Sequence, residues 1–451
     1  MTVENIKHHD TKLLLKLTIP IFFELILQVL LGNVDKIMVG NENLANAITQ
    51  ANTIIDMLTV SISVLSAGSL ILINQYKGAQ NIEKEKNIYS VAFFFNLLLS
   101  IALGLALFVF GKQILILMKV NEAYFEETLL YLRLCGGFLF FQGIILTFSS
   151  FLRSNTFVVQ SFIVSISINI LNVGLNALFL YVLKLPGIIS VALGTLISRF
   201  IGCIILLILI IRLAKIKLSV KDAIKNSKTE LKKLLKLSIP SAGESISYSL
   251  SQIVILTIIN IIDTKINPGA ATAKSFVNIM VQFSFIFTSS ITQAMQILLG
   301  RYLGARDITK AEKLITKTLI ISIVSSIIIA VIQALLARPI FSLFIDSYDI
   351  VTLCVKIMFI EILLEIGRAI NITFVRALQT SGDVIFPTLL AVIFCWGVAV
   401  IGSYVFGITL SLGIIGVWIA MTIDELCRGA IFIVRFKKGK WKKYNLVEKT
   451  N

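Results

Sequence analysis

The chain contains one short sequence twice. Residues 14–20 read LLKLTIP, and residues 234–240 read LLKLSIP. In each copy an acid follows the proline by four positions inside an apolar stretch, as Glu24 in the first copy and Glu244 in the second. A repeat at this separation indicates two homologous halves, each of which must fold into a similar unit.

Two further matches support the duplication. Residues 74–79 (NQYKGA) correspond to residues 300–305 (GRYLGA), and residues 151–154 (FLRS) correspond to residues 374–377 (FVRA). The separation between the copies stays nearly constant, so the halves differ only by small loop insertions. A duplicated chain with acids in apolar segments is typical of secondary transporters.

Hydrophobicity decides the fold class. Of the 451 residues, 57% are hydrophobic, a fraction outside the range of soluble globular proteins. A helix needs roughly 20 apolar residues to cross a bilayer, and runs of this length occur about twelve times between residues 13 and 434. Because membrane spans must satisfy their own backbone hydrogen bonds, these runs predict helices. We expect an all-α polytopic membrane protein with 12 transmembrane helices in two homologous six-helix bundles, related as a parallel repeat.

The basic residues predict the orientation. Of the 41 Lys and Arg residues, about 29 lie at the termini and in alternate loops, as the positive-inside rule requires for cytoplasmic termini. The net charge of +16 therefore reflects topology, and we expect a lipid bilayer and no nucleic acid as partner. We place the chain in a bacterial inner membrane. The predicted parts are an N-terminal lobe (1–211), a basic cytoplasmic linker (212–233), a C-terminal lobe (234–436) and a basic cytoplasmic tail (437–451).

Several kinds of chemistry lack the residues that they need. The only histidines are His8 and His9, near the N-terminus, and the five cysteines have no paired spacing. We therefore predict no metal site and no cofactor. A Walker-type glycine loop is also missing, so transport would draw on an ion gradient and not on ATP. We predict that the chain is not an enzyme.

Carboxylates in the spans are the candidates for binding a coupling ion. A charge at the bilayer centre costs about 3 kcal/mol or more, so acids persist there when they are paired, protonated or functional. A buried acid with neighbouring amides suits either H⁺ or Na⁺. Asp35 and Glu244 are the leading candidates because neither has a basic residue in register on its own helix, apart from Lys36 beside Asp35. Glu24 is a secondary candidate.

Two further acidic groups include an arginine. Glu361 and Glu365 lie one helical turn apart, and Arg368 follows three residues later, so an ion pair within the helix competes with a coupling role. We retain Glu365 as a coupling candidate and Glu361 as a secondary one. Residues 424–428 (DELCR) form a similar group, for which we expect a structural role.

Neutral polar side chains accompany the acids. Asn172 and Asn176 lie one turn apart on one helix face, and Thr195 follows on the next helix. Such amides hold membrane helices together, and they are also suitable neutral ligands for a cation bound by one carboxylate. In the second half, polar and aromatic residues interleave, which suits either packing or the binding of an organic cation. The candidates for a substrate cavity are Tyr248, Gln252, Gln282, Phe283 and Gln293.

Each half has a proline inside its first helix. Pro20 and Pro240 each remove a backbone hydrogen bond and bend the helix. Bends of this kind serve as hinges in transporters or remain as static kinks, and we mark both prolines as hinge candidates.

Several short motifs occur in order along nearly the whole chain. They are VDKIMVG at 34–40, GA at 78–79 and 304–305, RA at 376–377, SGD at 381–383, Pro387, GIIGVWIA at 413–420 and GKW at 439–441. Their order and spacing resemble those of the multidrug and toxic compound extrusion (MATE) transporters. The resemblance implies two six-helix bundles facing each other in a V, with a cavity that opens alternately to each side and with drug efflux driven by Na⁺ or H⁺.

The resemblance also implies roles for single residues. Asp35 lies where the family has an aspartate used in coupling. Asn172 and Asn176 match a pattern in which one branch has Asn followed four residues later by Asp, so this chain has one negative charge fewer there. Glu365 resembles the family's acid on the tenth helix, whereas Glu244 lies about one turn before the seventh-helix glutamate of another branch.

We therefore expect a secondary active multidrug efflux transporter that works as a monomer. It would exchange cationic or amphipathic organic compounds for H⁺ or Na⁺ by alternating access of two lobes. A flippase for a lipid-linked precursor is the alternative, although it would need a basic cavity and the bases within the spans, mainly Arg199, Arg368 and Arg428, are few. A membrane enzyme would lack a catalytic pair, and two repeats of different acid content do not form a symmetric channel.

Overall fold

The computed structural model describes residues 10–31, 34–444 and 446–447, and within these residues the chain forms helices and turns without strands. His8, His9 and the ends of the predicted N-terminal lobe and tail lie outside the described residues. The helices of the first half are α1 (Asp10–Leu31), α2 (Val34–Met38), α3 (Glu42–Gly78), α4 (Ile82–Leu117), α5 (Phe125–Tyr131), α6 (Phe140–Ser154), α7 (Val158–Ala177), α8 (Gly187–Arg212) and α9 (Val220–Asn226). Those of the second half are α10 (Lys232–Lys265), α11 (Ala270–Gly304), α12 (Ile308–Phe341), α13 (Tyr348–Ser381), α14 (Ile385–Phe394), α15 (Ile401–Tyr404) and α16 (Gly413–Lys437).

Twelve helical stretches of the described residues are long enough to be membrane spans. Nine pass a test of length and hydropathy, and the pair made of residues 122–136 and α6, bent by 43°, is a tenth. The other two are α13 and α16, of 34 and 25 residues, in which every 18-residue window contains at least three charged side chains. The predicted fold of two six-helix halves is confirmed, and α13 and α16 fall outside the test because of their charged side chains.

The described residues divide into two compact units. Residues 19–238 form one unit, which we call the first-half unit, and residues 10–18 together with 239–447 form the second-half unit. Both divisions fall inside a helix, in α1 one residue before Pro20 and in α10 one residue before Pro240. The predicted lobe boundaries and the hinge role of the prolines stay predictions.

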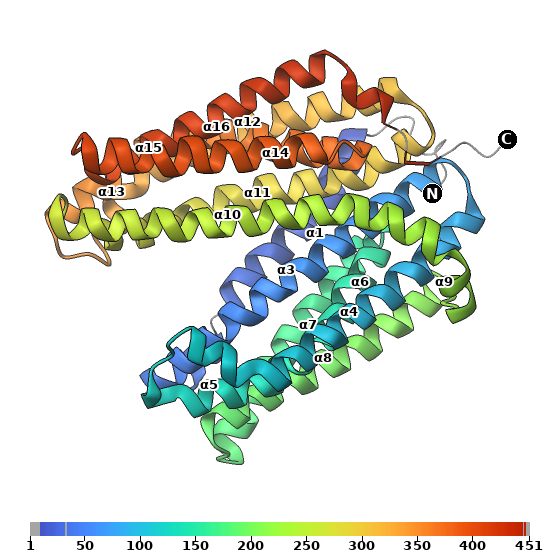
Figure 1. The fold of residues 1–451 in the computed structure, drawn as a ribbon, viewed down its shortest axis with the longest axis horizontal. Helices are drawn as coiled ribbons and strands as arrows, with labels where there is room; N and C mark the ends of the chain where they lie inside the picture. The colour runs from blue at the N-terminus through green and yellow to red at the C-terminus, as the bar shows by residue number, and fades with distance from the viewer. Residues whose placement is uncertain (1–9, 32–33, 445, 448–451) are drawn as a thin grey trace. The chain divides into compact units, whose positions relative to one another are not determined.

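In the first-half unit, α3 packs against α4, α5 and α6, and α8 packs against α6 and α7 (Figure 1). The buried core between these helices is aliphatic, with Ile55 from α3, Leu107 from α4 and Val191 from α8 among its side chains. This packing fixes the positions of α7 and α8, which carry the polar residues of the site described below.

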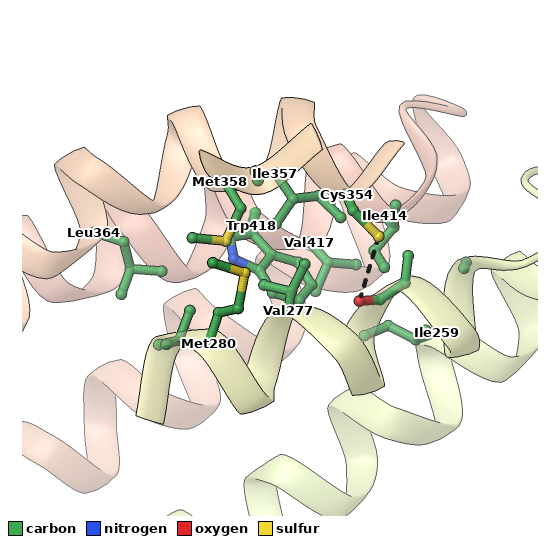
Figure 2. Close-up of a cluster of buried hydrophobic side chains, with 14 of the residues drawn as sticks. Ile259, Val277, Met280, Cys354, Ile357, Met358, Leu364, Ile414, Val417 and Trp418 are labelled. Carbon is green, nitrogen blue, oxygen red and sulfur yellow. Dashed lines mark hydrogen bonds between the residues drawn. The ribbon is translucent and has the colours of Figure 1, made fainter. Parts of the chain in front are cut away.

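In the second-half unit, α13 packs against α11, α12 and α16. Figure 2 shows the core that joins these helices, in which Trp418 of α16 packs with Met280 of α11 and Met358 of α13. The indole of Trp418 is 2% exposed, and its Nε1 donates a hydrogen bond to Glu361 Oε2 at 2.7 Å. Because a buried indole N–H needs a partner, this contact connects the apolar core to the acids of α13.

The two halves share one turn in atomic detail. After α3, the backbone N–H of Gln80 donates to Lys77 and that of Asn81 donates to Tyr76; after α11, the equivalent bonds run from residues 306 and 307 to residues 303 and 302. Gln80 and Arg306 both have positive φ, at 56° and 59°. Asn81 caps α4, and its counterpart Asp307 caps α12, each through an amide N–H three residues later at 3.0 Å. Such a cap satisfies one of the free N–H groups at a helix start.

Candidate functional site

Asp35 lies on α2, where helices of the first-half unit surround its carboxylate with donors. Nδ2 of Asn176, on α7, donates to Oδ1 at 2.6 Å. The hydroxyl groups of Thr195, on α8, and Tyr131, on α5, donate to Oδ2 at 3.3 and 3.5 Å. Asn172 in turn donates to the Thr195 hydroxyl at 3.1 Å. The structure thus brings together the four first-half residues that the sequence groups, and adds Tyr131.

The amide of Asn176 has an unused acceptor. Asn176 is completely buried, and its Oδ1 has no hydrogen-bond partner among the described residues. Gly194 of α8 lies against this oxygen, because a Cβ atom at position 194 would come within 2.0 Å of it. A buried acceptor without a partner costs about 1–3 kcal/mol, so a donor or a cation that reaches Oδ1 gains that energy.

One guanidinium acts on this site from a distance. Arg199 of α8 interacts electrostatically with Asp35 and with Asp56 of α3, but forms no ion pair with them within 4.0 Å among the described residues. The Nη1 atom of Arg199 is buried without a hydrogen-bond partner there. The first-half site therefore contains one carboxylate held by neutral donors, with a positive charge nearby that does not neutralise it by contact.

The second-half unit contains a network of four acids and two arginines on α13 and α16. Arg368 pairs with Glu361 at 3.0 Å and with Glu365, whose other oxygen accepts from Ser284 at 2.6 Å. Every carboxylate oxygen of the network contacts a donor. The network contains four acids and only two guanidinium groups, so acids outnumber bases. Arg428 makes the second set of pairs, with Asp424 at 2.5 Å and with Glu425 at 2.9 Å.

A small cavity opens beside this network. Its volume is about 20 Å³, enough for one water molecule or a cation of similar size. Tyr248 and Gln252, two of the candidates for the substrate cavity, line it together with residues of the network, whereas Gln282, Phe283 and Gln293 do not. The substrate cavity itself stays a prediction. Gln282 and Phe283 are exposed on the surface of the unit. The complete lining is Tyr248, Gln252, Leu364, Arg368, Cys395, Ala399, Met421, Asp424 and Glu425.

The repeated acids each face the repeated arginine of their own half. Glu24 is 2% exposed and pairs with Arg153 of α6 at 2.7 Å, and Ser165 donates to the same carboxylate at 3.2 Å. Glu244 interacts electrostatically with Arg376 of α13 without a pair within 4.0 Å. It accepts only longer bonds, from Gln379 at 3.4 Å and from Thr388 at 3.5 Å. The acid and the arginine are therefore in contact in the first half, whereas in the second half they interact only at longer range.

Some residues of these sites are absent from the sequence-based candidates. Tyr131 and Arg153 carried no signal as single residues, although the repeat match at 151–154 contains the arginine. Arg199 stood out as a rare base in a span, but nothing in the sequence assigned it to Asp35. Among the described residues no group of three or more His, Cys, Asp or Glu side chains could hold a metal ion.

Comparisons with known proteins agree with this architecture. The chain is 31% identical to "Uncharacterized transporter YisQ" of Bacillus subtilis (strain 168), over 95% of this chain and 94% of that protein. It is 25% identical to "Probable multidrug resistance protein NorM" of Thermotoga maritima, over 96% and 93%. Its fold matches a crystal structure described as MATE in the bent conformation, with a TM-score of 0.89, 17% identity and coverage of 98% and 99%.

The family comparison matches the chain twice. The MatE family model aligns with residues 20–178 and again with residues 240–405, so each half contains one copy. The two copies begin at Pro20 and Pro240, the same residues from which the internal repeat was recognised. The chain is a membrane transporter and not an enzyme, and it belongs to the MatE family.

Proposed function

We propose that the protein is a secondary active antiporter that exports cationic or amphipathic organic compounds in exchange for H⁺ or Na⁺. The observation that carries this proposal is the Asp35 site, where a carboxylate inside the first-half unit accepts hydrogen bonds from the neutral side chains of Asn176 and Thr195. A carboxylate surrounded by amide and hydroxyl groups within a membrane span supplies the oxygen ligands that H⁺ or Na⁺ binding requires.

Coupling requires that ion and cargo favour different states of the protein. An ion that binds Asp35 more tightly in one state shifts the equilibrium towards that state, and the cargo shifts it back. Asn172, Asn176 and Thr195 would hold the ion with Asp35, while Glu244 and Glu365 are the candidates in the second half. Pro20 and Pro240 would absorb the change in helix direction.

The proposed cargo is positively charged. Tyr248 and Gln252 lie next to a network of four acids and two arginines, in which acids outnumber bases, and this favours an organic cation over an anion. The name of the Thermotoga maritima relative, a probable multidrug resistance protein, supports drugs as the cargo. A flippase for a lipid-linked precursor is not favoured, because a pyrophosphate group would meet carboxylates there.

Transport in proteoliposomes tests the proposal. The purified protein would be reconstituted, and the movement of a fluorescent cationic dye would be followed under an imposed Na⁺ gradient or an imposed pH gradient. We expect one of the gradients to drive dye movement, with Asp35→Asn reducing the driven rate at least about tenfold and Glu244→Gln reducing it less.

The control is Glu83→Gln, which removes one exposed carboxylate outside both sites and should leave the rate unchanged. No dye movement under either gradient, with correctly folded protein, would overturn the antiport proposal for cationic cargo. An Asp35→Asn variant as active as the wild type would remove Asp35 from the mechanism.

A further inference from the structure

The linker between the halves presents a surface of unpaired basic side chains. We define the basic linker face by its seven exposed residues, and none of them forms an ion pair among the described residues. Glu230, one of the two acids of the linker, is 3% exposed and accepts a hydrogen bond from the Tyr76 hydroxyl at 2.5 Å, which leaves Asp222 as the only exposed acid. The face consists of Arg212, Lys215, Lys217, Lys221, Lys225, Lys228 and Lys232.

The helix of this linker is docked onto the first-half unit. The backbone N–H of Ser219 donates to Ser90 Oγ of α4 at 3.1 Å, and Ser219 Oγ caps α9 by accepting from the Asp222 N–H at 3.2 Å. Ile216 and Ala223 are buried against the unit. A solvated linker would make no such contacts. These contacts therefore hold α9 at a fixed position on the first-half unit.

Two large apolar side chains point outward from the same helix. Val220 is 56% exposed and Ile224 is 71% exposed, and they lie one turn apart on one face of α9. Lys221 and Lys225 follow them in sequence. The preceding helix, α8, is a candidate membrane span that ends at Arg212, and α9 follows it after a short connection at Val220.

We propose that the basic linker face binds the headgroups of anionic phospholipids in the adjacent leaflet, with Val220 and Ile224 inserted at the boundary of the acyl chains. Basic residues with large apolar neighbours on a short surface helix are the features that bind such an interface. Each lysine close to an anionic surface adds to the attraction, which salt weakens because the charges are exposed. A soluble phosphate would satisfy the lysines but would leave the apolar pair in water, so the lipid is the ligand that matches both features.

Fluorescence quenching in the reconstituted full chain tests the proposal. Ile224→Trp places a reporter at the position expected to insert, and the unmodified protein records the background from its three native tryptophans. The quenchers are phosphatidylglycerol and phosphatidylcholine with identically brominated acyl chains, each at the same fraction in unbrominated phosphatidylcholine. We expect brominated phosphatidylglycerol to quench Trp at 224 at least about twofold more than brominated phosphatidylcholine, and less at high salt.

Charge variants separate this surface from general lipid contact. Combining Lys221→Gln, Lys225→Gln and Lys228→Gln should abolish the difference between the two lipids. The matched control removes the same number of exposed lysines from outside the linker, as Lys112→Gln, Lys119→Gln and Lys184→Gln, and should preserve the difference. A second measurement without the reporter is native mass spectrometry, in which the wild type should retain more phosphatidylglycerol than the linker variant.

Three results would overturn the proposal. Equal quenching by both lipids, or none above background, would show a solvated linker. Loss of the lipid preference in the presence of millimolar glycerol phosphate would indicate a site for soluble phosphate. A matched control that behaves like the linker variant would show that only the total charge matters. None of these measurements depends on transport, so they stand apart from the antiport proposal.

Discussion

The two halves are homologous in sequence, but the side chains that surround their buried acids differ. Asp35 in the first half is held by neutral donors, with Arg199 near but not in contact. In the second half, Arg368 and Arg428 contact all four acids of the network. The first arrangement surrounds one carboxylate with amide and hydroxyl groups, whereas the second pairs four acids with two guanidinium groups. A repeated fold therefore fixes where acids lie, and the neighbouring side chains decide what those acids do.

Removing a guanidinium should have the largest effect, because it would leave two buried acids without a base. We expect Arg368→Gln to destabilise the second-half unit by about 3–5 kcal/mol. Thermal unfolding in detergent would measure the loss. Adding Glu365→Gln to this variant should recover part of the stability, and Asp35→Asn should destabilise the protein clearly less than Arg368→Gln does. If Asp35→Asn were as harmful as Arg368→Gln, the contrast between the two sites would fail.

A methyl group at Gly194 should disturb the first site alone. Because Cβ would come within 2.0 Å of Asn176 Oδ1, we expect Gly194→Ala to displace the amide from Asp35. The expected cost is about 1–3 kcal/mol of stability, and gradient-driven dye transport should fall about tenfold. Gly174→Ala is the matched control on α7, since nothing lies within 4 Å of a Cβ atom there. Equal effects of the two substitutions would refute the proposed packing of the amide.

The smallest predicted difference concerns the shared turn. Burial opposes ionisation of Asp307, but hydrogen bonds from Lys310 and the charges of Lys310 and Lys313 prevail and lower its pKa below the ordinary value of 3.8. An acid whose pKa is lower in the folded state stabilises the fold above its unfolded pKa, and this contribution disappears as the pH falls through the folded pKa.

We therefore expect the start of α12 to exchange its amide hydrogens faster, relative to the start of α4, as the pH falls below about 4. The effect should stay below about 1 kcal/mol because the Asp307 ion pair is largely solvated. Asp307→Asn keeps a capping side chain and restores the residue type of Asn81, so it should remove the pH dependence. Hydrogen exchange measured by mass spectrometry, corrected for intrinsic rates, would detect it, and an unchanged pH dependence in Asp307→Asn would contradict this assignment.

Much of the fold could be predicted from the sequence because its causes are local or periodic. Apolar runs of bilayer length specify helices, and the repeat at residues 74–79 and 300–305 identified a turn that both halves build in the same way. Two spans, α13 and α16, were recognised in spite of their charges, since their apolar residues still extend over the required length.

The site could be predicted only in part, because contacts between distant residues leave no local pattern. Asp35, Asn176 and Thr195 were grouped by polarity and by family resemblance, yet the Tyr131 hydroxyl that joins them gave no sequence signal. Gln282 and Phe283 were chosen as cavity residues by type; they are exposed on the surface of their unit, and their place in a substrate cavity stays a prediction. Side chains that face lipid and side chains that face a cavity have similar composition, so residue type alone does not separate them.

The division of α1 and α10 has a consequence for how the protein is made. Residues 10–18 are synthesised before the first-half unit but belong to the second-half unit, and the first-half unit is complete only after Ser238, within the first helix of the second half, has been synthesised. Since domains generally fold as units during synthesis, neither half finishes folding on its own sequence. A cut in the linker would therefore separate residues 10–18 and 234–238 from the units to which they belong.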